Sequence, residues 1–230
     1  MKIETEFSLA VRAVAVNPDP AKAGAITDAQ SRYNLINLVR ANNDKLEADP
    51  AQLAALVRLC EAVGASAGAA SRIASGMVSA MTAAGKSEPG TPLRPQTAAQ
   101  LAWLGVGPDD LRALTPYVTL LPVATPVNVN TAPREVLVAA IEGLDLATAE
   151  RLVQRRQRVA FADTGAVKSE APNAKLENAK IDVKSSYFEI RGRMRLGDRV
   201  LEQISLVRRS ANGIEVLRRD RISGLDQPAS

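Results

Sequence analysis

Histidine is missing from this chain of 230 residues, and cysteine occurs only once. Histidine is the commonest general base, transition-metal ligand and physiological pH switch, so its absence removes the residue on which most catalytic and metal sites depend. A single cysteine excludes an intrachain disulfide and a cysteine-rich zinc site. Cys60 lies in a segment with helical spacing, Gln52–Glu61, and no histidine is available to activate it. We therefore expect a buried, unreactive thiol.

Aromatic residues are also scarce, at 3% of the chain, although 46% of the residues are hydrophobic. The core is therefore expected to consist of Leu, Val, Ile and Ala. No apolar run reaches the ~20 residues that a membrane-spanning helix needs, and no secretory signal opens the chain, so we expect a soluble chain. Lys and Arg (29) outnumber Asp and Glu (25) by too little to predict a nucleic-acid partner.

The periodicity of the apolar residues predicts the order strand, helices, strands. Alternating apolar residues over Phe7–Ala15 indicate a first strand. Asp49 and Pro50 are typical of a helix start, and helical patterns follow through most of the chain. The expected helices cover residues 50–63, 69–83, 97–104, 109–115, 131–142 and 147–159.

The C-terminal part of the chain changes to a period of two residues. Apolar residues alternate over Phe188–Leu196, and the dipeptides Gly197-Asp198 and Asn212-Gly213 are typical of hairpin turns. We therefore expect a three-stranded antiparallel meander. The arginines that alternate with its apolar residues are expected to line the solvent face and to discourage edge pairing; they are Arg191, Arg193 and Arg195.

One strand at the front of the chain cannot bury a face by itself, but it can join the C-terminal meander. We therefore expect an α+β fold in which residues 1–40 and 181–230 form a discontinuous antiparallel sheet domain. Residues 41–160 are expected to form a large all-α insert domain with turns like those of a helix-hairpin-helix. Residues 161–180, rich in Ala, Lys, Asn, Glu and Gly, are expected to form a mobile loop.

The strongest local motif begins at Leu121-Pro122 and continues over Val127–Leu137. Asn130 or Thr131 is expected to accept backbone donors at the start of the next helix, where Pro133 suits the first turn. Asn128 and Asn130 are expected to hold an irregular approach to that helix through side-chain-to-backbone hydrogen bonds. We interpret the motif as a structural helix entry without catalytic chemistry. Its candidate residues are Pro122, Asn128, Asn130, Thr131, Ala132 and Pro133.

The residues after this motif are similar to a helix-hairpin-helix, in which glycine-rich turns offer backbone N–H groups to DNA phosphates. Gly143 lies in the turn, but Asp145 stands where a second glycine would lie and brings a negative charge toward any phosphate. The positive charges of three arginines would instead attract a phosphate; they are Arg151, Arg155 and Arg156. We favour a structural hairpin and keep a DNA-binding protein of the competence type as the alternative function.

Three segments resemble one known family, the minor pseudopilin subunit K of type II secretion. Phe7–Val16 followed by Ile26–Leu38 resembles the family's opening, in which a strand leads to a "D…G-R-x-N-L-N-x-L" segment. Here Ser31 stands at the glycine position, and Ile36 separates Leu35 from Asn37. Leu114–Ala132 is similar to the family's central motif, and Ser185–Phe188 resembles the entry to its final strand. The resemblance extends over nearly the whole chain, and its central motif is the most specific part.

The resemblance implies a pilin-like antiparallel sheet domain interrupted by a large all-α insert. It also implies a non-enzymatic protein at the tip of the pseudopilus, on the periplasmic side of the bacterial inner membrane, which starts or caps pseudopilus assembly for protein export across the outer membrane. The expected partners are minor pseudopilins I and J, with the major pseudopilin and secreted cargo as further ones, but no partner-binding residues are predicted. The chain contains no phosphate-binding glycine loop, HExxH or GxSxG motif, which agrees with a role outside catalysis.

Two features of the family are expected to be absent. Its members begin with a cleaved leader and a hydrophobic helix that anchors them in the inner membrane, so we expect this chain to be a truncated soluble form with Met1 as an added start. Contact with the membrane is expected only through that missing helix. Some members bind calcium through an Asp-rich stretch, but the matching residues 71–81 contain no carboxylate here, so no metal or other cofactor is expected.

Overall fold

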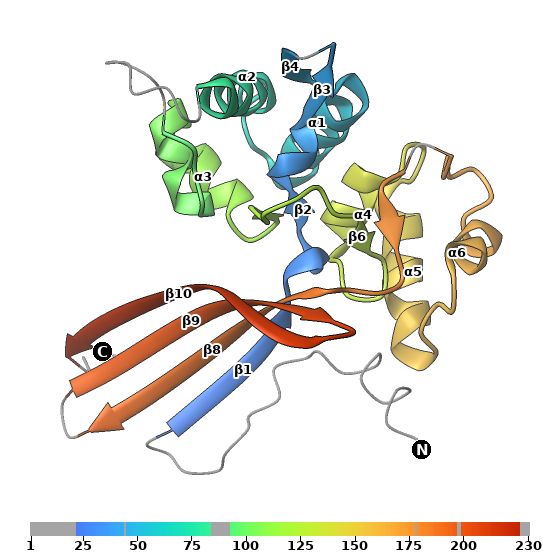
Figure 1. The fold of residues 1–230 in the computed structure, drawn as a ribbon. Helices are drawn as coiled ribbons and strands as arrows, with labels where there is room; N and C mark the ends of the chain where they lie inside the picture. Colours follow the sequence, from blue (N-terminus) through green and yellow to red (C-terminus); the bar gives the residue numbers. More distant parts are fainter. Residues whose placement is uncertain (1–21, 44, 84–92, 178, 197–198, 226–230) are drawn as a thin grey trace. The chain divides into compact units, whose positions relative to one another are not determined.

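The computed structural model describes residues 22–43, 45–83, 93–177, 179–196 and 199–225, which form two compact units (Figure 1). The first unit combines the two ends of the chain, up to Ala29 and from Lys184. The second unit is the continuous segment Gln30–Val183 between them. A sheet domain interrupted by an insert is thus present, but the insert begins and ends outside the expected 41–160.

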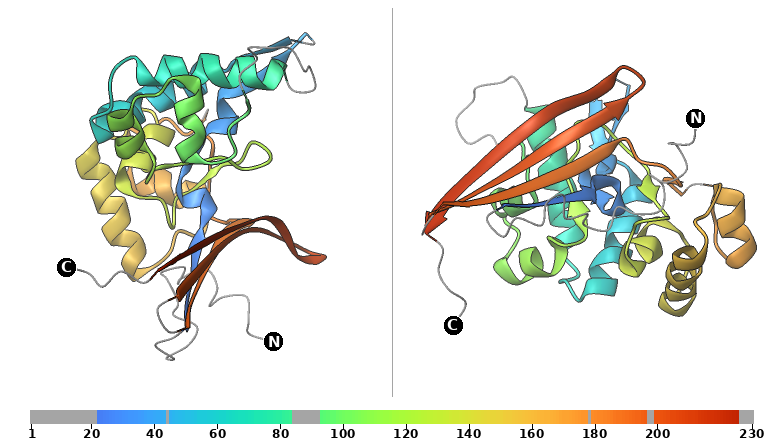
Figure 2. Two further views of the ribbon diagram at one scale, coloured as in Figure 1. Left: turned by 90° about the vertical axis from the view of Figure 1, so that its left-hand side faces the viewer. Right: turned by 90° about the horizontal axis from the view of Figure 1, so that it is seen from below.

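The first unit is a four-stranded antiparallel sheet with the order β1-β8-β9-β10 (Figure 2). Its strands are β1 (Lys22–Asp28), β8 (Tyr187–Leu196), β9 (Arg199–Ser210) and β10 (Gly213–Leu225). The predicted meander corresponds to β8, β9 and β10. The predicted front strand Phe7–Ala15 lies outside the described residues, and β1, which the pattern did not identify as a strand, pairs with β8.

The two faces of β8 differ in chemistry. Arg191, Arg193 and Arg195 are exposed on one face, as predicted, and Arg191 forms an ion pair with Glu202 of β9 at 3.1 Å. Ile190 and Met194 project from the opposite face, and they also keep 36% and 47% of their surface exposed. The alternation therefore separates charged from apolar residues without burying either set completely.

The second unit contains short strand pairs and most of the helices. The parallel pairs are β2 (Tyr33–Asn34) with β5 (Val118–Thr119) and β6 (Val127–Asn128) with β7 (Ile181–Asp182), and the antiparallel pair is β3 (Val39–Asn42) with β4 (Lys45–Ala48). The helices are η1 (Ala29–Ser31), which begins at the unit boundary, η2 (Leu35–Leu38), α1 (Pro50–Val63), α2 (Ala69–Thr82), η3 (Ala98–Leu104), α3 (Pro108–Leu114), α4 (Arg134–Ala140), α5 (Leu146–Arg158) and α6 (Thr164–Glu170).

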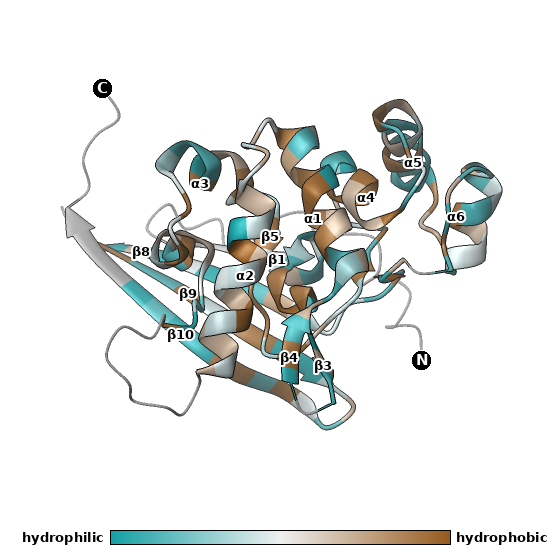
Figure 3. Ribbon diagram, turned by 90° about the horizontal axis from the view of Figure 1, so that it is seen from above, coloured by the Kyte–Doolittle hydropathy of each residue, from teal (hydrophilic) through white to brown (hydrophobic). Residues whose placement is uncertain are grey.

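Helix α1 shows how local signals and packing agree. The Asp49 carboxylate accepts hydrogen bonds from Ala51 N and Gln52 N at 2.9 and 3.2 Å, and Gly64 ends the helix with a left-handed φ of 72°. Hydrophobic residues of α1 and α4 lie beside each other in the core (Figure 3). Cys60 is 2% exposed on the buried face of α1, which confirms the expected buried thiol.

Residues 33–38 belong to the core of the second unit, although they were expected in the sheet domain. Tyr33 is 1% exposed, and Leu35 and Leu38 are fully buried. The Tyr33 hydroxyl donates a hydrogen bond to Gln52 O of α1 at 2.9 Å. The physical reason for the difference in boundary is therefore that the apolar side chains of this segment pack with the helices.

The segment 161–180 contains a helix where a loop was expected. Asp163 caps α6 by accepting a hydrogen bond from Ala166 N at 2.8 Å. Val167, Ala171 and Ala174 are at most 3% exposed and join the core of the second unit. The interpretation as a loop was wrong over α6 because small side chains, mostly alanine, bury this segment without a marked hydrophobic pattern.

Within the described residues, each helix is too short or too polar to cross a membrane.

Candidate functional site

The connector between β5 and β6, residues 120–126, is held by the buried side chain of Asn34. The Asn34 amide nitrogen donates to Val123 O at 2.8 Å and to Thr125 Oγ1 at 3.0 Å. Its oxygen accepts from Leu121 N at 3.2 Å and from Ile36 N at 3.2 Å, the second bond capping η2. One amide therefore fixes both the start of η2 and the path of the connector.

Asn37 completes this first clamp, which we define as Asn34 and Asn37. Its amide nitrogen donates to Thr125 O at 2.9 Å, and its oxygen accepts from Thr125 N at 3.0 Å. Gln30 adds a hydrogen bond from Nε2 to Pro126 O at 3.0 Å. Both clamp residues are 1% exposed, so they satisfy connector backbone groups that water does not reach.

Asn128 and Asn130 form a second clamp at the predicted motif. The Asn128 oxygen Oδ1 accepts from Asn130 N at 2.9 Å, and the Asn128 backbone oxygen accepts from Ala132 N, also at 2.9 Å. The Asn130 amide pairs with Phe161, accepting from its N–H at 2.8 Å and donating to its C=O at 3.0 Å. It also donates to Val183 O at 3.1 Å. The second clamp thus joins three separate segments of the unit.

The start of α4 differs from the prediction. Its N-cap is Pro133, with no side-chain cap, and Pro133 O accepts hydrogen bonds from Val136 N and Leu137 N at 3.1 Å each. Neither Asn130 nor Thr131 caps the helix, because the Asn130 amide is used to bind Phe161 and Val183 instead. The expected side-chain-to-backbone bonds are present, but they shape the approach to α4 rather than its first turn.

The remaining candidate residues of the motif occupy contrasting positions. Ala132 is fully buried, and Pro122 is exposed in the connector. The Thr131 hydroxyl donates a hydrogen bond to Asn128 O at 3.4 Å. Asn34 and Asn37 are the two asparagines of the segment that resembles the family's opening, but the sequence predicted no role for their side chains. The signal available was the presence of two asparagines three residues apart within an apolar run.

The turn between α4 and α5 does not leave a site for phosphate. The Asp145 carboxylate caps α5, accepting from Thr148 N at 2.7 Å and from the Thr148 hydroxyl at 3.0 Å. These hydrogen bonds hold the pKa of Asp145 below its usual range, so the turn carries a negative charge at neutral pH. The geometry gives the DNA-binding alternative no support.

The arginines of α5 are partly used for structure. The Arg156 guanidinium donates to Val129 O within the motif, and burial lowers the pKa of Arg156 to about 10. Arg155 pairs with Glu170 of α6 at 3.3 Å and lies over the Phe161 ring at 4.8 Å. These contacts connect α5 to Val129, which lies between the two asparagines of the second clamp, and to α6.

The described residues contain no group of three or more His, Cys, Asp and Glu side chains arranged to hold a metal ion. Burial raises the pKa of the Cys60 thiol to about 11, so the thiol stays protonated and is a poor nucleophile. Asparagine amides supply the polar chemistry of the two clamps. Neutral amides that bind backbone groups fix a shape, and they supply neither a nucleophile nor a general base.

The fold and the clamps define an α+β protein in which a sheet is interrupted by a helical insert with a shaped connector. A family model described as type II secretion system (T2SS), protein K matches residues 127–187, and a second model with the same description matches residues 31–123. Together they match more than half of the chain. The chain belongs to the type II secretion system protein K family.

Two curated relatives carry the name type II secretion system protein K. The protein of Pseudomonas aeruginosa is 34% identical over 128 residues, which is 54% of this chain and 38% of the relative. The protein of Pectobacterium carotovorum is 32% identical over 127 residues, which is 50% of this chain and 38% of the relative. The matched part therefore spans well under half the length of either relative.

A solved structure supports the fold over a longer range. It is a chain from the crystal structure of the GspK-GspI-GspJ complex of the enterotoxigenic Escherichia coli type 2 secretion system. The match has a TM-score of 0.68 and covers 94% of this chain and 90% of that chain. Sequence identity is 18%, so the likeness concerns the fold.

Proposed function

We propose that this chain is a minor pseudopilin at the tip of the type II secretion pseudopilus, where it binds other minor pseudopilins to start or cap assembly for protein export. The observation that carries the proposal is the match of both family models, which cover residues 31–123 and 127–187. The two clamps lie in this matched region and give it a fixed surface. A protein that assembles with others needs such a surface, whereas it needs no catalytic group.

The proposed partners are minor pseudopilins I and J, with the major pseudopilin and secreted cargo as further candidates. The support is the solved chain of similar fold, which comes from a complex of GspK, GspI and GspJ. The proposal places the chain on the periplasmic side of the inner membrane and assigns it no enzymatic activity.

We also propose that the chain needs no calcium or other cofactor. The residues that match the calcium-binding stretch of other members lie in α2, where residues 71–81 carry no carboxylate to act as a ligand. Excess EDTA is therefore expected to leave the thermal unfolding midpoint unchanged within error, and added calcium to raise it by less than about 1 °C, because a bound ion stabilises only a state that binds it. A midpoint that falls in EDTA and recovers with calcium would contradict this proposal.

Co-purification tests the main proposal. The chain is mixed with the soluble domains of minor pseudopilins I and J from the same organism, and with a DNA duplex as a parallel ligand. We expect a stable ternary complex in size-exclusion chromatography and no DNA binding at low salt. Failure to join I and J, together with a DNA affinity that falls steeply with salt, would favour the alternative function instead.

A further inference from the structure

One face of α5 carries a high density of positive charge. Arg151, Arg155 and Arg158 follow one another at helical spacings of four and three residues, so they share one side of the helix. Together with Gln154 and Val159 they line a hollow of about 390 Å³, which we call the α5 groove. The helix dipole favours the arginines of the last turn, but like charges at these spacings destabilise a helix. The stability of α5 alone therefore does not account for this face.

The groove contains more positive charge than its acidic neighbours neutralise. Arg155 pairs with Glu170 of α6 at 3.3 Å. Within the described residues, Arg151 pairs with no carboxylate and donates to the Thr148 hydroxyl at 2.8 Å, and Arg158 has no hydrogen bond or ion pair. Three cations and one anion thus leave two positive charges without a counter-charge from the described part of the chain.

The ion pair at the centre of the groove indicates which chemistry the groove binds. A carboxylate accepts two parallel hydrogen bonds from a planar guanidinium group, which is why arginine is favoured where carboxylates are recognised. The Arg155 guanidinium also donates to Val159 O and lies over the Phe161 ring at 4.8 Å, so it is held in place. The centre of the groove is therefore fixed and already holds a carboxylate, that of Glu170.

We propose that the α5 groove binds an acidic segment of a partner protein, with one carboxylate at Arg151 and another at Arg158. Seven residues of helix separate these two arginines, a distance of about 10 Å along α5. An extended segment in the polyproline II conformation returns to the same side every three residues, or about 9 Å. Acidic residues three apart in such a segment therefore match the spacing of the two arginines. The inference goes beyond the proposed function, because it rests on the charge of α5 and not on the family.

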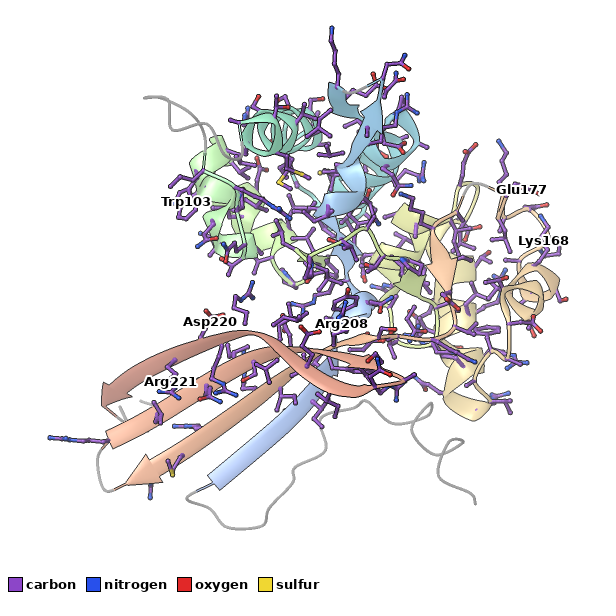
Figure 4. The ribbon with its side chains drawn as sticks, in the orientation of Figure 1. Trp103, Lys168, Glu177, Arg208, Asp220 and Arg221 are labelled. Carbon is purple, nitrogen blue, oxygen red and sulfur yellow. The ribbon has the colours of Figure 1, made fainter. Side chains whose placement is uncertain are left out.

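Nucleic acid and membrane match the groove less well than an acidic protein segment. Glu170 places a carboxylate between the arginines, and Asp145 is ionised in the turn before α5, so both repel a continuous row of phosphates. A helix at a membrane surface needs a broad exposed apolar face, whereas Leu152 in the middle of α5 is 2% exposed. Lys168 of α6 does not extend the groove, because its ammonium group donates to Ala174 O (Figure 4).

The test measures binding of a fluorescein-labelled hexaglutamate peptide to the whole chain by fluorescence anisotropy at low salt. We expect saturable binding that is at least tenfold weaker in the double variant Arg151→Gln/Arg158→Gln. The matched control is Arg40→Gln/Arg112→Gln, which also removes two exposed arginines, but ones that pair with carboxylates at 2.6 and 2.9 Å. Its affinity is expected to stay within twofold of the wild type. Thermal unfolding verifies that both double variants are folded.

A change of the opposite sign gives a second measurement. Glu170→Gln removes the carboxylate at the centre of the groove, so the affinity for the peptide is expected to rise at least threefold. Glu47→Gln is the control, because it removes an exposed carboxylate that pairs with Arg40 in the β3–β4 hairpin at 2.6 Å. Its affinity is expected to stay within 1.5-fold of the wild type. A gain in Glu170→Gln alone would place Arg155 in the binding site.

Several results would overturn the proposal. Absence of saturable binding, or equal losses in the two double variants, would mean that any attraction comes from the net charge of the chain. An unchanged affinity in Glu170→Gln would exclude Arg155 from the site. Displacement of the peptide by duplex DNA or phosphatidylglycerol vesicles at a lower concentration of charge than by unlabelled hexaglutamate would assign the groove to phosphates. None of these measurements uses minor pseudopilins I and J, so this inference and the proposed function fail separately.

Discussion

Asn37 and Asn130 use their side-chain amides in the same way, since each pairs with both the N–H and the C=O of one distant residue, Thr125 and Phe161 respectively. An amide can do this because it carries a donor and an acceptor side by side and needs no counter-charge when buried. A carboxylate would lack the donor, and a hydroxyl group would not reach both atoms. The identity of these residues is therefore set by the backbone groups that they satisfy.

Asn37→Ala is expected to lower the free energy of unfolding by about 2–4 kcal/mol, because it leaves the N–H and the C=O of buried Thr125 without their partner. Guanidinium denaturation followed by circular dichroism measures the change. Asn42→Ala is the control. Asn42 is exposed, and its side-chain amide donates to Glu47 Oε1 at 3.0 Å on the surface of the β3–β4 hairpin. Loss of this side chain is therefore expected to lower the free energy of unfolding by less than about 0.5 kcal/mol. Equal losses in the two variants would show that the first clamp contributes little.

Cys60 provides a measure of local protection. Because burial raises the pKa of its thiol to about 11, the thiol is protonated at pH 8, whereas an unfolded thiol titrates near its ordinary value of about 8.5. We expect iodoacetamide at pH 8 to modify the native chain at least 100-fold more slowly than the chain in guanidinium. Raising the pH toward 10 in the native state should increase the rate. Fast native alkylation would mean that α1 opens readily.

At the scale of elements, the turn between α4 and α5 depends on a glycine. Gly143 has a φ of 80°, and a Cβ there would lie 2.8 Å from the backbone oxygen of Asn173. This close approach brings the segment after α6 against the turn, where Lys175 N donates to Glu142 O at 2.8 Å. The turn is therefore built for contact with the chain that follows α6.

Gly143→Ala is expected to lower the free energy of unfolding by about 2 kcal/mol or more. The added Cβ combines the strain of a left-handed backbone with a clash against the backbone oxygen of Asn173. Gly64→Ala separates the two effects. Gly64 has a similar φ of 72°, but a Cβ there meets nothing within 4 Å, so only the strain of about 1 kcal/mol applies. Chemical denaturation of both variants gives the comparison. If Gly143→Ala lowers the free energy of unfolding no more than Gly64→Ala does, the backbone around Asn173 shifts to accommodate the added methyl group at little cost in free energy.

Elements with strong local signals could be predicted from the sequence. Helix α1 has a capping Asp49 and a terminal Gly64, and the C-terminal meander has a clear period of two residues and an Asn212-Gly213 turn. Helix α6 was missed because its buried side chains include alanines, which carry little hydrophobic signal. Strand β1 was missed because KAGAITD contains few of the β-branched and aromatic residues that mark strands.

The candidate site was predictable only in part. The sequence indicated that Asn128 and Asn130 bind backbone groups, since asparagines beside a helix start commonly do so. It did not indicate which groups, because Phe161 and Val183 lie 31 and 53 residues away from Asn130. The first clamp was missed for the same reason, as Asn37 and Thr125 are 88 residues apart. Local patterns identify polar residues, but the fold decides their partners.

At the scale of the whole molecule, the two units differ in how they bury apolar residues. The main hydrophobic core consists of residues between Tyr33 and Ala174, all within the second unit. The described part of the sheet unit buries few large side chains, among them Tyr187, Leu206 and Val207. A continuous segment of this size with its own core is typical of an independent folding domain.

Residues 30–183 are therefore expected to fold when expressed alone. This fragment keeps both clamps with all the partners described above, and a single cooperative transition in thermal and guanidinium unfolding would show it. A fragment of residues 41–160 is the matched comparison: it loses Asn34, Asn37 and the buried side chains of η2, and it leaves Asn130 without Phe161 and Val183. We expect it to unfold over a broad range and to be cut rapidly by trypsin. Cooperative folding of 41–160, or its failure in 30–183, would mean that the clamps do not define the domain.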